Sequence, residues 1–136
     1  MEFSINEYRK YNEDEILNLY QSVGWINYTN NPNMLKNAYA NSLKILGAYE
    51  NEKLIGIIRV VGDGYSIVFI QDIIVLPEYQ RHGIGTALLK KILEIYQNVY
   101  QKSLLTDNTD KTIQFYKSVG FEMDTDIECR AFTKML

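Results

Sequence analysis

The chain has 136 residues, of which 46% are apolar and 23% charged, the balance of a globular protein that can bury its own core. Its formal charge is -3 and no run of Lys or Arg stands out, so a nucleic-acid-binding surface is not expected. One cysteine cannot form an internal disulfide, and one histidine with one cysteine is too few for a zinc site.

No apolar stretch approaches the ~20 residues that a membrane helix needs, and the first residues lack the apolar region of a signal peptide. We therefore predict a cytoplasmic protein without membrane contact. Because no linker, repeat or low-complexity tract interrupts the chain, we expect residues 1–136 to form a single domain.

The N-terminal third predicts one strand followed by helices. Residues 3–9 alternate as an edge strand does. Asn12 and the acidic residues after it indicate a helix start, and Gly24 is placed to end that helix. Residues 25–32 are polar and turn-prone, and a second short helix is expected over residues 33–40.

The middle of the chain predicts an antiparallel meander. Residues 43–49 and 53–61 are two apolar runs joined by a short polar turn, which is typical of a hairpin. Residues 66–76 form a third, longer apolar run. In residues 83–98, apolar side chains recur every three or four positions, which predicts an amphipathic helix packed on the sheet.

The C-terminal third predicts a strand over residues 103–106, a helix over 109–118 and a terminal pair of strands ending at Leu136. The element order favours an α/β (α+β) fold. We expect a mixed central sheet of about six to seven strands with helices on both faces.

The segment from Val75 to Thr86 joins a buried strand to a helix start. Gly83 and Gly85 let the backbone approach a ligand without interference from a Cβ atom. The first N–H groups of a helix have no internal partner, and the helix dipole adds partial positive charge there. A pyrophosphate is the ligand that suits such a turn best.

Two common nucleotide-binding patterns do not fit this turn. The dinucleotide fingerprint requires a third glycine where this chain has Leu88, and a P-loop requires Lys and then Ser or Thr after the glycine, where it has Thr86 and Ala87. The remaining pattern is Gln/Arg-x-x-Gly-x-Gly, which Gln80, Gly83 and Gly85 satisfy.

With this pattern the chain resembles the GNAT superfamily of acetyl-CoA-dependent N-acetyltransferases. The resemblance runs from about residue 43 to residue 136 and is strongest over residues 72–89 and 107–121. It implies a GNAT-like domain in which backbone N–H groups of the turn bind the coenzyme A pyrophosphate, here Arg81, His82, Gly83, Ile84, Gly85 and Thr86. It also implies that the preceding strand pairs with the pantetheine arm through Ile73, Ile74 and Val75.

Acetyl transfer to an amine has two proton requirements. The amine must lose a proton before it attacks, and the thiolate must gain one as it leaves. The segment ending in Tyr116 and Gly120-Phe121 resembles the family signature in which the tyrosine is the general acid. The resemblance further implies that Asn108 bonds the pantetheine, although the common spacing of seven residues before the tyrosine falls on Thr109.

The general base is less defined. Several family members carry a glutamate at the position that Gln71 occupies here, and glutamine cannot take a proton. Asp72 is adjacent, but strict strand alternation points it to the opposite face. Two alternatives stay open: Asp72 acts through a bulge, or a water chain delivers the proton to solvent.

Two other side chains with catalytic potential are not assigned a catalytic role. We interpret His82 as a solvent-facing turn residue, and we do not expect Cys129 to act as a nucleophile. Trp25 and Tyr28 stand where family members line the acceptor pocket, although they could equally close the core. Arg59 is interpreted as a charge on the surface of a strand.

The sequence therefore predicts an N-acetyltransferase that moves an acetyl group from acetyl-CoA, bound as a substrate, directly to a primary amine of a small molecule, without a metal. The alternatives are a protein amine as acceptor, or a noncatalytic acyl-CoA-binding or regulatory module. The acceptor, the range of acyl groups and homodimer formation are left open.

Overall fold

The computed structural model describes residues 1–136 and divides them into two compact units, Met1–Leu105 and Thr106–Leu136. Each unit is described by itself. That residues 1–136 form one domain stays a prediction.

The first unit contains a five-stranded sheet in the order β1-β2-β3-β4-β5. The strands β1 to β4 pair antiparallel and β5 pairs parallel to β4. Their bounds are Ser4–Glu7, Lys44–Glu50, Lys53–Gly62, Ile67–Val75 and Gln101–Leu104. The predicted edge strand and meander are confirmed, and β5 begins two residues earlier than expected.

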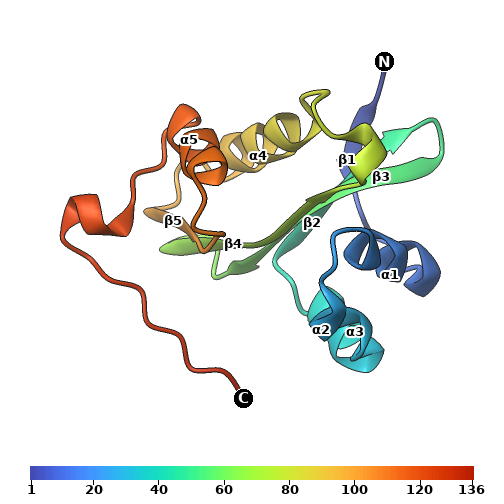
Figure 1. Cartoon of the computed structure of the whole chain (residues 1–136), viewed down its shortest axis with the longest axis horizontal. Coiled ribbons are helices and arrows are strands. Elements are labelled where there is room, and N and C mark those ends of the chain that lie inside the picture. The colour runs from blue at the N-terminus through green and yellow to red at the C-terminus, as the bar shows by residue number, and fades with distance from the viewer. The chain divides into compact units, whose positions relative to one another are not determined.

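Helices cover both faces of this sheet, as predicted (Figure 1). One face carries α1 (Glu13–Ser22), α2 (Ile26–Thr29) and α3 (Pro32–Ala40), and the other carries α4 (Ile84–Ile95). The predicted helix start is confirmed, because the Asn12 side chain accepts from the Glu15 N–H at 3.1 Å. The short helix α2 was not predicted and lies within the segment expected to be a turn.

One part of the core forms where α4 packs on β2, β3 and β4, and the other lies under α1 and α3 on the opposite face. The apolar face of α4 is buried, as its spacing predicted, through Ile84, Leu88, Leu89 and Ile92. Gly56 of β3 lets this helix approach, because a Cβ atom there would lie 3.1 Å from the Ile74 carbonyl oxygen and 3.4 Å from the Ile84 side chain. The absence of a side chain on β3 thus helps to place the first turn of α4.

The second unit contains α5 (Asp110–Ser118) and the 3-10 helix η2 (Asp124–Ile127). The predicted terminal pair of strands is wrong, since residues 121–136 form no strand and the sheet has five strands rather than six or seven. Asp124 and Asp126 lie in the first turn of η2, and Glu128 has a left-handed φ of 61°, which interrupts any extended run. Phe132 and Leu136, at the end of the chain, are exposed.

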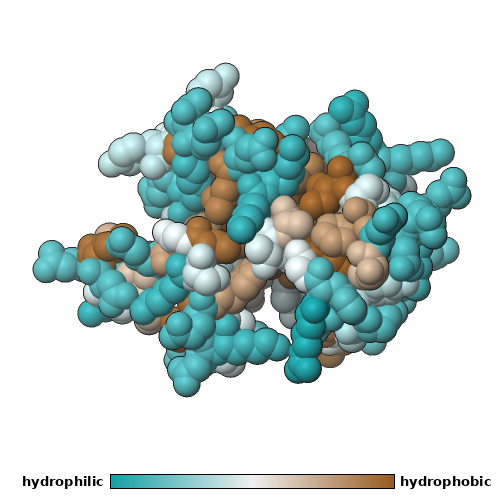
Figure 2. Space-filling view, turned by 90° about the horizontal axis from the view of Figure 1, so that it is seen from above, coloured by the Kyte–Doolittle hydropathy of each residue, from teal (hydrophilic) through white to brown (hydrophobic).

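No helix of the structure is long and apolar enough to cross a membrane. Hydrophilic side chains cover most of the face drawn in Figure 2, with smaller apolar areas between them.

We expect Gly56→Val to lower the free energy of unfolding by about 2–3 kcal/mol, because overpacking must displace the first turn of α4 or the β4 backbone. Chemical denaturation measures this loss. Gln101→Val, at an exposed position of β5, is the control and should change stability by less than about 0.5 kcal/mol. Equal effects of the two substitutions would contradict the close approach of α4 to β3.

Candidate active site

The turn between β4 and α4 has an unusual backbone. After β4 the chain makes the 3-10 helix η1 (Pro77–Tyr79) and then two left-handed residues, Arg81 at φ 67° and Gly83 at φ 78°. Gly83 is the N-cap of α4. The turn is held by the Gln80 side chain, which donates to the Val75 carbonyl at 3.1 Å, and by the Tyr79 hydroxyl, which donates to Glu50 at 2.8 Å.

This backbone leaves six consecutive N–H groups without a partner in the protein. No carbonyl or side chain accepts from Arg81, His82, Gly83, Ile84, Gly85 or Thr86, whereas the next N–H, that of Ala87, donates to the Gly83 carbonyl at 3.0 Å. Several of these donors lie at the positive end of the α4 dipole, and nothing stands within 4 Å of where a Cβ atom of Gly83 would be. The turn therefore has the donors and the open approach that a phosphate group needs.

The strand before the turn has a free edge. β4 pairs with β5 only from Ile67 to Ile70, while its other side stays paired with β3 as far as Val75. Over Ile73, Ile74 and Val75 the edge of β4 on the β5 side consequently has no strand partner, although the Val75 carbonyl accepts from the Gln80 side chain. An extended ligand could add there as a strand does.

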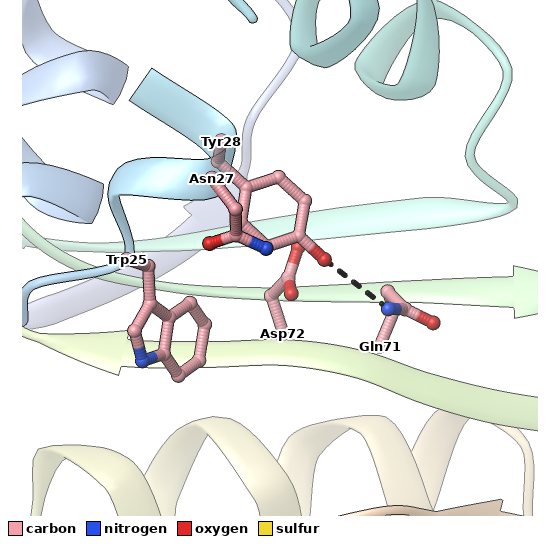
Figure 3. A pocket seen from close by; sticks show the side chains of 5 residues that line it. All are labelled: Trp25, Asn27, Tyr28, Gln71 and Asp72. Carbon is pink, nitrogen blue, oxygen red and sulfur yellow. Dashed lines mark hydrogen bonds between the residues drawn. The ribbon is translucent and has the colours of Figure 1, made fainter. Parts of the chain in front are cut away.

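A β-bulge in β4 changes the direction of two side chains. Arg59 pairs with Asp72 and Val60 pairs with Ile70, so Gln71 is the extra residue. Gln71 and Asp72 therefore line the same pocket (Figure 3). The expectation from strict alternation, that Asp72 points to the opposite face, is wrong, and the bulge that the sequence left open is present.

The pocket has a volume of about 230 Å³ and lies between the α1–α2 region and β4. Its other lining residues are Trp25, Asn27 and Tyr28. The Gln71 side-chain amide donates to the Tyr28 hydroxyl at 3.3 Å, which closes one side of the pocket (Figure 3). The two aromatic residues that the sequence singled out thus lie beside the residue proposed as base.

A buried network holds Asp72. Its Oδ2 accepts from Arg59 Nε at 2.8 Å and from the Tyr20 hydroxyl at 2.6 Å, and the Tyr20 and Tyr39 hydroxyls lie 3.0 Å apart. Burial raises the pKa of Tyr20 and of Tyr39 far above the ordinary value, so both phenols stay protonated.

The prediction that Arg59 is a surface charge is wrong, because the residue is only 5% exposed. In the sequence, the only sign of the Arg59–Asp72 ion pair was that Arg59 interrupts an otherwise apolar run. The strand register is what shows that Asp72 is the partner of Arg59.

The second unit carries Tyr116 and Asn108. The Tyr116 ring packs edge-on against Phe115 and Phe121, and the Phe121 N–H donates to the Tyr116 carbonyl at 3.1 Å. Burial raises the pKa of the Tyr116 phenol. Asn108 is exposed, whereas Thr109 is engaged as the N-cap of α5, accepting from the Thr112 N–H.

The side chains that could bind a metal ion do not cluster in this structure. No three His, Cys, Asp or Glu side chains come close enough to hold a metal ion, and Cys129 is an exposed free thiol.

Comparison with known families identifies the chain. A sequence model of the acetyltransferase (GNAT) domain matches residues 41–123, which include the bulge, the turn and the helix with Tyr116. The chain therefore belongs to the GNAT acetyltransferase domain family.

Curated relatives agree with this family. GCN5-related N-acetyltransferase 2, a chloroplastic protein of Arabidopsis thaliana, is 34% identical over 79 residues, which are 57% of this chain and 30% of the relative. Glucosamine 6-phosphate N-acetyltransferase of Trypanosoma brucei brucei is 31% identical over 58 residues, covering 43% of this chain and 40% of the relative. The chain spans about a third of the length of the first curated relatives that it matches.

Solved structures extend the likeness to the whole chain. A GNAT family acetyltransferase from Streptococcus pneumoniae is 39% identical with a TM-score of 0.89, covering 99% of this chain and 98% of that one. The PaiA N-acetyltransferase of Thermoplasma acidophilum, solved with coenzyme A, shares the fold at 18% identity, with a TM-score of 0.74 and coverage of 90% and 91%.

We expect Arg59→Met to lower the free energy of unfolding by about 3–5 kcal/mol, because it leaves the Asp72 carboxylate buried without its counter-charge. Denaturant titration measures the loss. The double variant Arg59→Met/Asp72→Leu should regain a large part of it, since no buried charge then remains. Additive losses in the double variant would show that the two charges are not coupled.

Proposed function

We propose that the protein is an acetyl-CoA-dependent N-acetyltransferase that transfers the acetyl group directly to a primary amine of a small molecule. The observation that carries the proposal is the run of six unpartnered N–H groups from Arg81 to Thr86 at the start of α4. The activity named for its relatives and the membership of the GNAT family support it.

Donor binding uses the turn and the free edge of β4. The six N–H groups donate to the oxygens of the pyrophosphate, which the helix dipole favours further. The pantetheine arm lies along Ile73, Ile74 and Val75 and pairs with backbone groups that β5 leaves free. Asn108 contributes a bond to the same arm, as the family resemblance implies.

The transfer step exchanges one bond for another. The nitrogen lone pair of the neutral amine attacks the thioester carbonyl carbon, a C–N bond forms, and the C–S bond breaks with its electrons passing to sulfur. Tyr116 gives its proton to the thiolate, and burial, which raises the pKa of the phenol, keeps that proton in place until the thiolate forms. The proton that the acceptor ammonium loses passes to Asp72 and, through water, to solvent.

The acceptor occupies the pocket beside Asp72. Gln71 cannot take a proton, so the bulge is what brings a carboxylate to this side of β4. Because the pocket is open to the surface, the amine at the end of a protein side chain is the second candidate acceptor. A cytoplasmic location and a homodimer stay predictions from the sequence.

Thiol release from acetyl-CoA, measured against a panel of amines, polyamines, amino sugars and peptides, tests this function. Release with a small primary amine is expected. Release with peptides alone would favour the protein-amine alternative, and tight acetyl-CoA binding without release would favour a noncatalytic module.

We expect Gly83→Ala to weaken acetyl-CoA binding about tenfold or more, because an alanine at φ 78° strains the turn and redirects its N–H groups. Gly24→Ala is a matched control: its φ is 77°, and it too has open space at the Cβ position. Both variants should lose about 1 kcal/mol of stability, but only the first should lose affinity in calorimetry. Normal affinity of Gly83→Ala would remove the turn from the donor site.

We expect Tyr116→Phe to lower kcat about 10²-fold with little change in the acetyl-CoA Kd. Because the pKa of Tyr116 is raised, the wild-type phenol stays protonated through neutral pH, and its ionisation should lower kcat on the alkaline side. The variant should lack that alkaline limb. Tyr100→Phe, at an exposed tyrosine, serves as control. Unchanged kcat across pH in Tyr116→Phe would exclude the phenol as the acid.

A further inference from the structure

The charges that face the pocket are unevenly distributed. Among its five lining residues only Asp72 has a carboxylate, and no Lys, Arg or His lines the pocket. The nearest cation, Arg59, has a side chain only 6% exposed and is committed to Asp72 Oδ2. An anionic group of an acceptor would therefore find a carboxylate in the pocket and no accessible cation to pair with.

One oxygen of the Asp72 carboxylate accepts no hydrogen bond from the protein. Both hydrogen bonds that the protein donates to it, from Arg59 Nε and the Tyr20 hydroxyl, end on Oδ2, and Oδ1 receives none. The side chain is 1% exposed and lines the pocket (Figure 3). A carboxylate oxygen that no protein group donates to is available to a donor from a ligand, and a protonated primary amine offers three N–H groups.

Two aromatic rings form another part of the wall. Trp25 and Tyr28 both line the pocket, with ring centroids 6.3 Å apart and planes inclined by 38°. Each also packs against Tyr20, at 6.0 Å and 5.1 Å, which fixes them relative to the Asp72 network. Aromatic faces attract cations and accommodate the apolar stem of an amine.

We propose that this pocket selects a protonated primary amine on a short apolar stem and rejects amines that carry a carboxylate or phosphate near the amino group. Asp72 Oδ1 accepts from the ammonium, and the apolar stem lies against Trp25 and Tyr28. A volume of about 230 Å³ suits a small acceptor. The selectivity differs from that in the name of the Trypanosoma relative, whose glucosamine 6-phosphate carries a phosphate.

The proposal rests on the proposed function only in naming the ligand an acceptor, so its test measures binding without acetyl transfer. Trp25 is the only tryptophan of the chain and lines the pocket, so its fluorescence reports ligands there directly. The probes are two pairs that differ by one carboxylate beside the only amino group: isoamylamine against leucine, and phenethylamine against phenylalanine. Each amine should bind roughly tenfold or more tightly than its carboxylated partner, because the added charge faces Asp72 without a counter-charge.

Two variants test the residue assignments. Asp72→Asn should remove the preference within each pair, but it also leaves Arg59 buried without a counter-charge and can unfold the protein. Gln71→Lys avoids this difficulty, because Gln71 is exposed. It adds a cation to the pocket and should narrow or reverse the preference. Gln97→Lys adds the same charge at an exposed position just after α4, on the other face of the sheet, and should leave the preference unchanged.

The outcomes separate this proposal from the proposed function. Equal binding within each pair, tighter binding of the carboxylated probe, or no change of Trp25 fluorescence with any probe would overturn the selectivity. The expected preference in the absence of any acetyl transfer would support the selectivity and contradict the proposed function. Acetylation of all four probes at equal kcat/KM would support the proposed function and contradict the selectivity.

Discussion

A buried ion pair between Arg59 and Asp72 is the constraint on which the candidate site depends. The two residues are cross-strand partners beside the β4 bulge, and the Tyr20 hydroxyl completes the coordination of Asp72 Oδ2. A slip of one residue in the pairing of β3 and β4 would separate the two charges in the interior, at a cost of several kcal/mol. The pair therefore favours one register, and that register keeps Gln71 and Asp72 together on the pocket.

The same strand serves both halves of the proposed reaction. At Gln71 and Asp72, β4 presents side chains to the pocket, and over the next three residues β5 does not pair with its edge. The strand then ends, and the turn offers its N–H groups at the start of α4. Acceptor and donor would thus meet along one short length of chain, which is the arrangement that direct transfer requires.

Sequence reasoning succeeded where the determinants are local. The glycines of the turn, the Asn12 cap and the spacing of apolar residues in α4 each act over a few neighbouring residues, and the structure confirms the elements they predicted. The bulge and the burial of Arg59 depend on which residues oppose one another across two strands, which periodicity does not reveal. The predicted terminal strands failed because apolar residues such as Phe132 do not make a strand without a partner edge.

The central claim is that the unpartnered N–H groups from Arg81 to Thr86 bind the pyrophosphate of acetyl-CoA. Amide resonances measured by NMR during titration test it directly, with acetyl-CoA compared against pantetheine, which lacks the pyrophosphate. We expect acetyl-CoA to shift the amide signals of these six residues strongly, and pantetheine to leave them nearly unchanged while affecting Ile73 to Val75. Strong shifts elsewhere, with the turn unaffected by acetyl-CoA, would exclude the turn as the pyrophosphate site.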